Sequence, residues 1–350
     1  MKRLICVVMF LVFAASLNAG FFFPRPANLW GYIDSTGKLV VNPNFIEADN
    51  FYEGVAVVKK YKLSSYGKLR FYYIDKQGEP ITKNSYSAAS RFSEGLAIIG
   101  DGEKSWAINK FGQHMFECKV IADALFKEGL LPSMTSDSKF GYMNDEGIFI
   151  VPPSFSYAYN FSEGLAVVNR QGKYGYINKT GKLQIPEIYK SANPFMDNLA
   201  LVNKAGNKMF IDKSGKKVFI PTADEVYSFR NGLAPARFED KWGYYNTKGE
   251  IIIKPLFASA GNFAENYAKI EQDGKFGFVD KQGKIVIEPR FDDAMDFSEG
   301  LAPVKVGSKW GYINNEGKVI IKPRFKEVRQ FSGGRAAVCP GFPNTVILLP

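Results

Sequence analysis

The sequence predicts an all-β repeat protein, folded as an open, curved β-solenoid of nine small antiparallel units. Three observations support this: a period of 34 residues, β-prone runs of five to seven residues between turns, and a length of 350 residues. A single compact domain rarely exceeds about 250 residues. With 46% hydrophobic and 23% charged residues, the composition is not that of a disordered chain.

The N-terminus has the pattern of a secretory signal peptide. Lys2 and Arg3 precede an apolar run at residues 4–13, and small residues follow as far as Ala19. We expect cleavage after Ala19, although Leu17 is larger than is usual at its position; an uncleaved anchor is the alternative. The expected localisation is export without a lipid anchor, to the periplasm, the cell surface or the medium.

Four segments follow from this organisation: a signal peptide (1–19), an N-terminal lead (20–29), a repeat domain (30–339) and a C-terminal capping strand (340–350). Removing the first segment lowers the net charge from +10 to +8, so the mature chain stays basic. Its apolar runs are too short to span a bilayer, which takes roughly 18 residues, and no transmembrane span is expected.

A triplet of the Trp-Gly-Tyr type marks each repeat. Its first position falls at residues 30, 71, 105, 140, 174, 208, 242, 276 and 310, and a glycine follows seven positions later in every unit. The residues that define this frame most clearly are Trp30, Gly31, Tyr32, Gly37, Trp242, Gly243, Tyr244, Trp310, Gly311, Tyr312 and Gly317.

The last repeat shows the order of elements. Residues 300–306 and 310–314 are β-prone and flank a short polar link at 307–309, which is the signature of a β-hairpin. The next turn runs from Asn314 to Gly317: the Asn side chain caps it, and glycine accepts a positive φ without a Cβ clash.

A third strand is expected at residues 318–322, and Pro323 is expected to end it because proline has no amide for a sheet ladder. A loop of about ten residues, such as 290–299, then leads into the following unit. Each unit is therefore predicted to have three strands, too few to bury their own faces, so that stacked neighbours form the core.

These elements resemble the WG-repeat family of bacterial proteins. The shared elements are Trp-Gly-Tyr-Ile-Asp/Asn-x-x-Gly, Pro-x-Phe and Phe-x-Glu-Gly-Leu-Ala-x-Val, and they cover residues 30–339. The resemblance implies an all-β repeat scaffold, often exported, with no established general activity. Two units depart from it, Ser105-Trp106-Ala107 and Lys208-Met209-Phe210, so irregular packing is expected there.

The two ends of the repeat domain leave a choice between an open array and a closed ring. The last unit supplies a strand at residues 335–338, and pairing with the strand of Trp30 would close a β-propeller-like ring. The chain continues, however, with residues 344–348 at the register of a tenth strand, which would complete a terminal cap. We therefore favour the open array and keep the ring as the alternative.

The sequence offers little material for catalysis. His114 is the only histidine and has no Cys, Asp or Glu at a metal-site spacing. Cys118 and Cys339 lie in no nucleophile motif, and the sequence does not define whether they pair. No Walker loop, dinucleotide fingerprint or Gly-x-Ser-x-Gly elbow occurs, so no metal, cofactor or enzymatic activity is expected.

One acidic residue recurs in most units, immediately before a turn glycine or asparagine. These residues are Glu53, Glu94, Glu128, Glu163, Asp197, Glu265 and Glu299. Paired carboxylates can hydrolyse glycosides, but a shared register would line them along an edge instead of opposing two of them. We interpret them as turn-stabilising; an enzyme using Glu128 or Asp123 of the irregular third unit is the remote alternative.

An excess of seven residues in the first unit creates a basic loop, and insertions in repeat proteins often lie on the binding face. Its candidate binding residues are Lys59, Lys60, Tyr61, Lys62, Tyr66, Lys68 and Arg70. Such a loop suits a protein or an anionic envelope glycan, and export argues against nucleic acid. A long solvated hairpin without a ligand is the alternative.

The sequence thus favours a non-catalytic exported scaffold that binds a protein or an envelope glycan through an extended β surface. A structural or assembly element of the cell envelope without a discrete ligand is the second hypothesis, and a glycan- or cell-wall-acting enzyme is the third.

Overall fold

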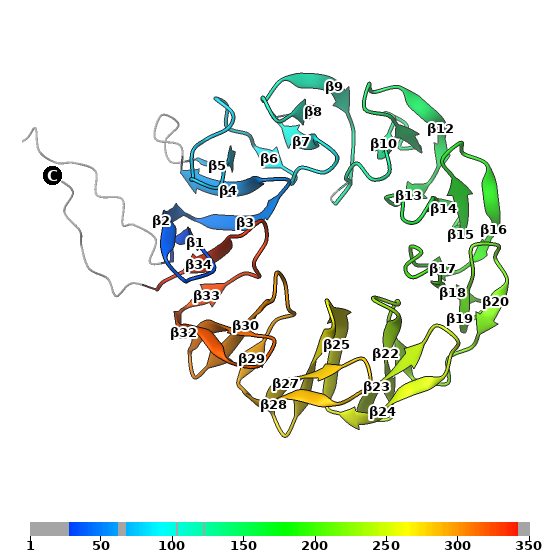
Figure 1. Cartoon of the computed structure of the whole chain (residues 1–350). Helices are drawn as coiled ribbons and strands as arrows, with labels where there is room; N and C mark the ends of the chain where they lie inside the picture. The colour runs from blue at the N-terminus through cyan, green and yellow to red at the C-terminus, as the bar shows by residue number, and fades with distance from the viewer. Residues whose placement is uncertain (1–27, 62–67, 103, 122, 342–350) are drawn as a thin grey trace, which may run out of the picture.

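A computed structural model, which describes residues 28–61, 68–102, 104–121 and 123–341, shows nine antiparallel sheets arranged in a closed ring around a central channel (Figure 1). Each sheet is one blade of a β-propeller. The prediction of an all-β fold with nine repeats is confirmed, whereas the open solenoid was wrong. Within these described ranges no helix is long and apolar enough to cross a membrane.

The blades are numbered here along the chain. Blade 1 combines β33 (Glu327–Val328), β34 (Ala336–Cys339), β1 (Trp30–Ile33) and β2 (Leu39–Phe45). Blade 2 has β3 (Glu47–Tyr52), β4 (Val55–Tyr61) and β5 (Leu69–Ile74); blade 3 has β6 (Ala88–Ala89), β7 (Leu96–Gly100), β8 (Ser105–Asn109) and β9 (His114–Cys118). Blade 4 has β10 (Leu131–Met134), β11 (Phe140–Met143) and β12 (Phe149–Phe155).

The remaining five blades have four strands each. Blade 5 has β13 (Tyr157–Ala158), β14 (Leu165–Arg170), β15 (Lys173–Asn178) and β16 (Leu183–Tyr189); blade 6 has β17 (Ser191–Ala192), β18 (Ala200–Lys204), β19 (Asn207–Ile211) and β20 (Lys217–Phe219). Blade 7 has β21 (Glu225–Val226), β22 (Leu233–Phe238), β23 (Lys241–Asn246) and β24 (Ile251–Phe257). Blade 8 has β25 (Ser259–Ala264), β26 (Tyr267–Gln272), β27 (Lys275–Asp280) and β28 (Ile285–Phe291); blade 9 has β29 (Asp293–Ala294), β30 (Leu301–Val306), β31 (Lys309–Asn314) and β32 (Val319–Phe325).

The prediction of three strands per unit was wrong for seven of the nine described blades, in which the expected loop contains a further strand. In blade 9 the two residues of β29 pair with β30, as Asp293 with Lys305 and Ala294 with Val304, and form the innermost strand. A pair of residues is too short to show the alternation of polar and apolar side chains by which a strand is recognised.

The ring closes inside blade 1, where the two ends of the repeat domain share one sheet. Strand β34 pairs antiparallel with β1, and Tyr32 stands opposite Ala337, both fully buried. The last strand is therefore the partner of the first and belongs to no terminal cap. Most of the expected capping strand (342–350), the signal peptide (1–19) and most of the lead (20–27) lie outside the described residues.

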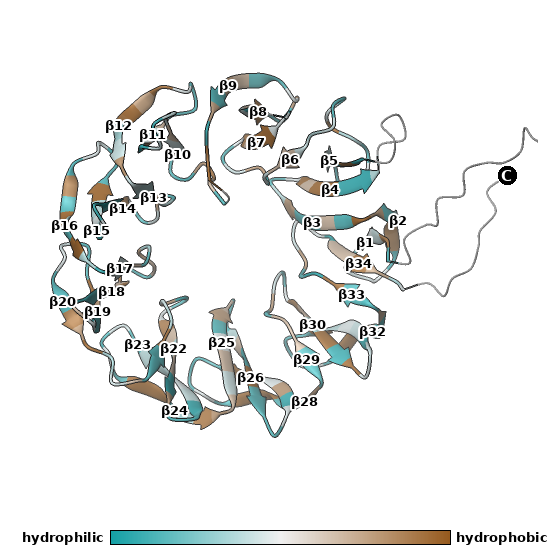
Figure 2. Cartoon of the chain, turned by 180° about the vertical axis from the view of Figure 1, so that it is seen from behind, coloured by the Kyte–Doolittle hydropathy of each residue, from teal (hydrophilic) through white to brown (hydrophobic). Residues whose placement is uncertain are grey.

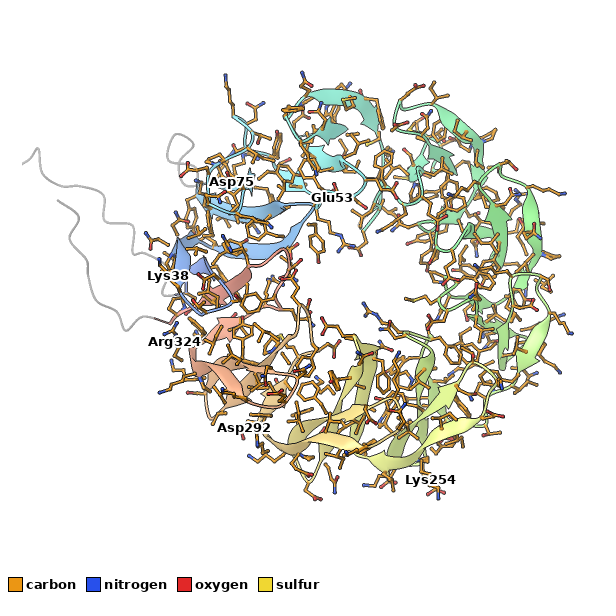
Figure 3. All side chains as sticks on the ribbon, viewed as in Figure 1. Lys38, Glu53, Asp75, Lys254, Asp292 and Arg324 are labelled. Carbon is orange, nitrogen blue, oxygen red and sulfur yellow. The ribbon has the colours of Figure 1, made fainter. Side chains whose placement is uncertain are left out.

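Side chains reinforce this closure on both sides of blade 1. Arg324, in β32 of blade 9, donates a hydrogen bond to the Gly37 carbonyl at 2.5 Å, and Figure 3 shows Arg324 close to the neighbouring Lys38 at the rim. On the other side, Arg329 Nε donates to the Ala48 carbonyl of blade 2 at 2.6 Å. The seam is thus held by a side chain of blade 9 on one side and by a side chain of blade 1 on the other.

Contact between blades depends on the tyrosine of the Trp-Gly-Tyr triplet. In six blades its hydroxyl donates to a carbonyl of the next blade's inner segment at 2.7–2.8 Å: Tyr32, Tyr73, Tyr142, Tyr176, Tyr244 and Tyr312. The same ring packs against the phenylalanine before the next acidic turn. With Phe210 and Phe278, which replace the tyrosine in two blades, eight such aromatic pairs have centroids 4.8–5.0 Å apart. Each pair contributes about 0.5–1.5 kcal/mol beyond its buried area.

The glycine of the triplet has a steric reason. A Cβ on Gly311 would lie 2.6 Å from Pro323 N of the outermost strand, and closer still to the Ile321 carbonyl oxygen. The strand β32 bulges inward there, which shifts the register between Trp310 and Tyr312. The expectation that Pro323 ends its strand was wrong, because proline is tolerated at a bulge on an edge strand, where its missing amide leaves no ladder bond unmade.

The outer strands also carry exposed apolar side chains, such as Ile251 and Ile252 of β24, and Figure 2 shows hydrophobic segments along the circumference at β12, β16 and β24. An exposed apolar edge strand invites pairing with another chain. Proline and the bulge interrupt this edge, so the repeat combines an apolar rim with protection against aggregation.

We expect Gly311→Ala to destabilise the protein by roughly 1–3 kcal/mol, because the new methyl group collides with the backbone of β32. Gly261→Ala is the matched control, since its Cβ would meet nothing closer than 3.5 Å. Urea denaturation of both variants measures the difference. Equal stability of the two variants would contradict the steric role of Gly311.

Candidate binding site

The recurrent acidic residues occupy the tight turns that follow the innermost segment of each blade, next to the channel. Glu53 and Gly54 have φ values of 52° and 83°, so both central positions of this turn are left-handed, as a type I′ hairpin requires. Figure 3 places Glu53 at the inner edge of the ring. An acid is a costly choice at positive φ, which calls for a compensating interaction.

That interaction is a bond to the next blade. The Glu53 carboxylate accepts hydrogen bonds from the backbone amides of Glu94 and Gly95, and the Glu94 carboxylate accepts them from Glu128 and Gly129 at 2.6 and 2.8 Å. All seven recurrent acids make such a bond to the following turn. They therefore stabilise contacts between turns of successive blades, where the sequence interpretation placed them within one turn.

Lysines neutralise part of this ring of carboxylates. Lys110 lies 3.2 Å from Glu53, Lys179 lies 3.2 Å from Glu128, and Lys213 lies 3.2 Å from Glu163. Each carboxylate is bound to the acidic turn of the next blade, so the acids form a chain of structural links along the ring. Glu128, which the remote enzyme hypothesis invoked, is one of those links.

The other chemically reactive residues are separated from one another. The His114 ring packs against Trp106 with centroids 5.0 Å apart. Cys118 and Cys339 are buried, unpaired thiols in blades 3 and 1. Burial raises the pKa of Cys118 to about 12 and also raises the pKa of Cys339, which disfavours the reactive thiolate. Among the described residues no three His, Cys, Asp or Glu side chains gather as a metal site would need.

A cavity of about 790 Å³ lies where blades 2, 3 and 4 meet the channel. We call it the axial cleft. Its lining includes charged and polar residues (Asp49, Tyr52, Ser90, Arg91, Ser105, Asp123, Asn160) and aliphatic ones (Ile98, Ile99, Val120, Ile121, Leu125). An apolar wall with a few polar groups is the usual make-up of a ligand pocket.

The axial cleft exists because the repeat frame fails at this junction. Ala107 of blade 3 stands where other blades have tyrosine or phenylalanine, so it neither donates a hydrogen bond to blade 4 nor packs as an aromatic ring. Blade 4, as far as the structure describes it, also lacks an innermost strand. Instead Asn160 of blade 5 braces the inner segment, donating to the Asp123 carbonyl and accepting from the Leu125 amide, each at 3.0 Å.

Arg91 supplies a positive charge inside the cleft. Its guanidinium carbon lies 4.2 Å from the ring centroid of Tyr52, a cation–π contact that orients the side chain. No described carboxylate lies within ion-pair distance of Arg91, although Asp49 and Asp123 also line the cleft. The guanidinium is therefore held in place with donors to spare.

The predicted basic loop is a long hairpin of blade 2 at the same end of the ring as the cleft mouth. Strands β4 and β5 extend it, with Lys60 opposite Arg70. Part of its charge is already engaged: Lys59 pairs with Glu47 at 3.0 Å, and Lys60 lies over the Tyr72 ring at 4.7 Å. Tyr61, Lys68 and Arg70 are described, whereas Lys62 and Tyr66 lie outside the described residues.

Alternation of strand direction brings this hairpin and the cleft to one face. In an antiparallel blade, successive turns lie at opposite ends. The β4–β5 turn, the β7–β8 turn with Gly100 and Ser105, and the connection through Val120 into blade 4 all lie at the end opposite the acidic turns. The sequence predicted the basic hairpin but not the cleft. The only feature of the sequence that pointed to the cleft was the irregular third unit, with Ala107 in place of an aromatic residue.

The sequence model of the WG-containing repeat family matches residues 30–63, 73–104, 140–174, 174–208, 209–242, 242–276, 276–310 and 310–339. The chain belongs to this family. The matches leave out residues 105–139, which include Ala107 and the inner segment of blade 4, so one side of the axial cleft is formed by a stretch that the family model does not match.

Solved structures with similar folds share little sequence with it. A eukaryotic initiation factor is 12% identical, with 91% of this chain and 100% of that chain covered and a TM-score of 0.58. BamB from Moraxella catarrhalis is 10% identical (85% and 97% covered, TM-score 0.42), and the WD40 β-propeller domain of Doa1 is 13% identical (69% and 91% covered, TM-score 0.34). The comparison with curated proteins found no match.

The acidic ring predicts a specific acid sensitivity. Burial acts to raise the pKa of Glu53, but hydrogen bonds from Lys110 and from the amides of Gly95 and Glu94 outweigh it and lower the pKa overall. Because the pKa of Glu53 is lower in the folded than in the unfolded protein, its carboxylate stabilises the fold at pH values above the unfolded pKa of 4.5. This contribution to stability is lost as the pH falls through the pKa of the folded protein.

We therefore expect Glu53→Gln to lose less stability than the wild type when the pH is lowered from about 5 to about 3. Denaturation midpoints at each pH measure this, with Glu316→Gln, in an exposed turn at the rim, as the control. A wild-type pH profile in the Glu53 variant would show that its carboxylate does not link the blades.

Proposed function

We propose that this protein is a non-catalytic scaffold that binds a partner protein on the face formed by blades 2, 3 and 4. The observation that carries this proposal is the axial cleft, an opening of about 790 Å³ at the junction where the family frame is interrupted. Repeat proteins use a regular array for stability and place recognition in the irregular parts.

The chemistry of this face suits a protein segment. Ile98 and Ile99 give the cleft an apolar wall for a side chain, while Arg91 offers unused donors for a carboxylate. The basic hairpin belongs to the same blade 2 and adds positive charge to this face at Lys60 and Arg70. An apolar anchor surrounded by charge is a common arrangement of protein recognition sites.

The protein is also proposed to act outside the cytoplasm. This rests on the leader at residues 1–19, with its basic start and apolar run before Ala19. The partner is accordingly sought among envelope proteins, where the scaffold would meet it after export.

Affinity capture from envelope extracts tests the binding face. We expect the wild-type protein to retain a defined set of proteins, and Arg91→Ala combined with Lys60→Glu and Arg70→Glu to reduce their recovery about tenfold, because the anchor and its charge are lost. Lys254→Glu is the control, since Lys254 lies on the outer rim of blade 7 (Figure 3).

The proposal fails if the wild type retains nothing beyond an empty matrix, or if all three proteins retain the same set. Circular dichroism of each variant checks that the fold is intact, which separates a lost contact from a lost structure.

A further inference from the structure

A second, smaller cavity of about 270 Å³ opens beside the channel between blades 6, 7 and 8, across the ring from the axial cleft. It is lined by Asn193, Met196, Val226, Tyr227, Ser228, Phe229, Arg230 and Asn262. Drug-sized ligands need roughly 300–1,000 Å³, so this cavity suits a single ring with polar substituents.

Tyr227 gives this cavity an aromatic platform. One face of its ring stacks on Trp242, with centroids 5.4 Å apart and planes only 6° apart. Despite this contact Tyr227 is 52% exposed. The stacking fixes the ring in one orientation and leaves it available to a ligand without a large loss of side-chain entropy.

The groups around this platform are hydrogen-bonding amides and hydroxyls. Asn193 Nδ2 donates to Ser228 Oγ at 3.0 Å, which holds both side chains in position. Asn262 Oδ1 is buried and accepts no hydrogen bond from any described residue. A buried acceptor without a donor is costly, and a ligand hydroxyl would satisfy it.

We propose that this cavity is a carbohydrate subsite that binds one pyranose ring. The C–H groups on one face of a pyranose carry partial positive charge and match the negative face of the Tyr227 ring. The hydroxyls at the edge of the sugar would pair with Asn193, Ser228 and Asn262, including the unsatisfied Oδ1. Arg230 adds a charged donor to the lining, and its charge acts, together with that of Lys269, on the partly buried carboxyl of Asp296 in blade 9.

This subsite is independent of the proposed protein-binding face. It lies on different blades and shares no lining residue with the axial cleft. Loss of one activity is therefore expected to leave the other intact, and the two proposals can fail separately.

The test is a titration of the full-length protein with linear trisaccharides of glucose and of N-acetylglucosamine. Binding is followed by ligand-observed NMR and by tryptophan fluorescence, because a sugar on Tyr227 alters the surroundings of Trp242. We expect millimolar affinity for at least one of them, a loss of about tenfold or more in Tyr227→Ala, and near-native affinity in Tyr227→Phe, which keeps the stacking face.

Tyr159→Ala is the matched control. Tyr159 occupies the equivalent position of blade 5, two residues before Phe161, and is 37% exposed. Its ring does not stack face to face but contacts Tyr157 edge-on, with the ring planes at 60°. We expect this variant to bind both sugars like the wild type. Equal weakening in Tyr159→Ala and Tyr227→Ala would overturn the assignment of the site.

Asn262→Leu separates ligand binding from stability. Because it removes a buried acceptor that has no partner, it should leave the thermal midpoint unchanged or raise it, while weakening sugar binding severalfold. Unchanged affinity in this variant, or a wild type that binds neither trisaccharide at millimolar concentrations, would refute the subsite.

Discussion

The contact of one blade with the next is the interaction on which the rest of the structure depends. A blade of three or four short strands has two faces to bury, and it buries both only inside the ring. The recurring tyrosine meets this need twice, since its ring packs on the phenylalanine of the next blade and its hydroxyl donates to a carbonyl there, as Tyr312 does with Phe331 and Arg329. Burial raises the pKa of the Tyr312 hydroxyl, so it remains a neutral donor across the physiological pH range. Gly311 allows the outer strand to approach, and Glu299 links the turns at the channel, so each residue of the repeat frame serves a contact with another strand or another blade.

Much of this frame could be predicted from sequence because its signals are local. The period, the turn from Asn314 to Gly317 and the hairpin of β30 and β31 depend on residues close in the chain, and all three were predicted correctly. Closure could not be decided in the same way. The curvature of an array arises from the angle at which blades pack, and residues 335–338 read as a strand whether they cap an open end or pair with β1. The error with Pro323 has a similar origin: proline ends a central strand but not an edge strand, and strand order is a tertiary property.

The candidate sites show the same limit more sharply. The seven-residue insertion between β4 and β5 was visible in sequence because it disturbs the period, and it led to the basic hairpin. Ala107 was recognised as a departure, but its consequence, an opening between blades 3 and 4, depends on the absence of a tyrosine that would have reached the next blade. Tyr227 gave no signal at all. It stands at a position where other units have residues as different as Asp49, Gly261 and Tyr159, and only the stacking on Trp242 distinguishes it from these.

This pattern suggests how a nine-fold scaffold acquires specificity. Residues that contact the neighbouring blade can vary little. A substitution there must still pack against a buried ring of the next blade or satisfy a hydrogen bond to it. Positions on the inner segment two residues before the phenylalanine contribute chiefly a carbonyl oxygen to the frame, which any residue supplies, although the side chains of Arg329 and Asn193 also bond to the next blade. Four of these side chains, Asp49, Ser90, Asn193 and Tyr227, line the two cavities, so that variation among them changes the cavities without changing the fold. The axial cleft and the Tyr227 cavity arise in two different ways from this freedom, the first by loss of a frame residue and the second by substitution at a free position.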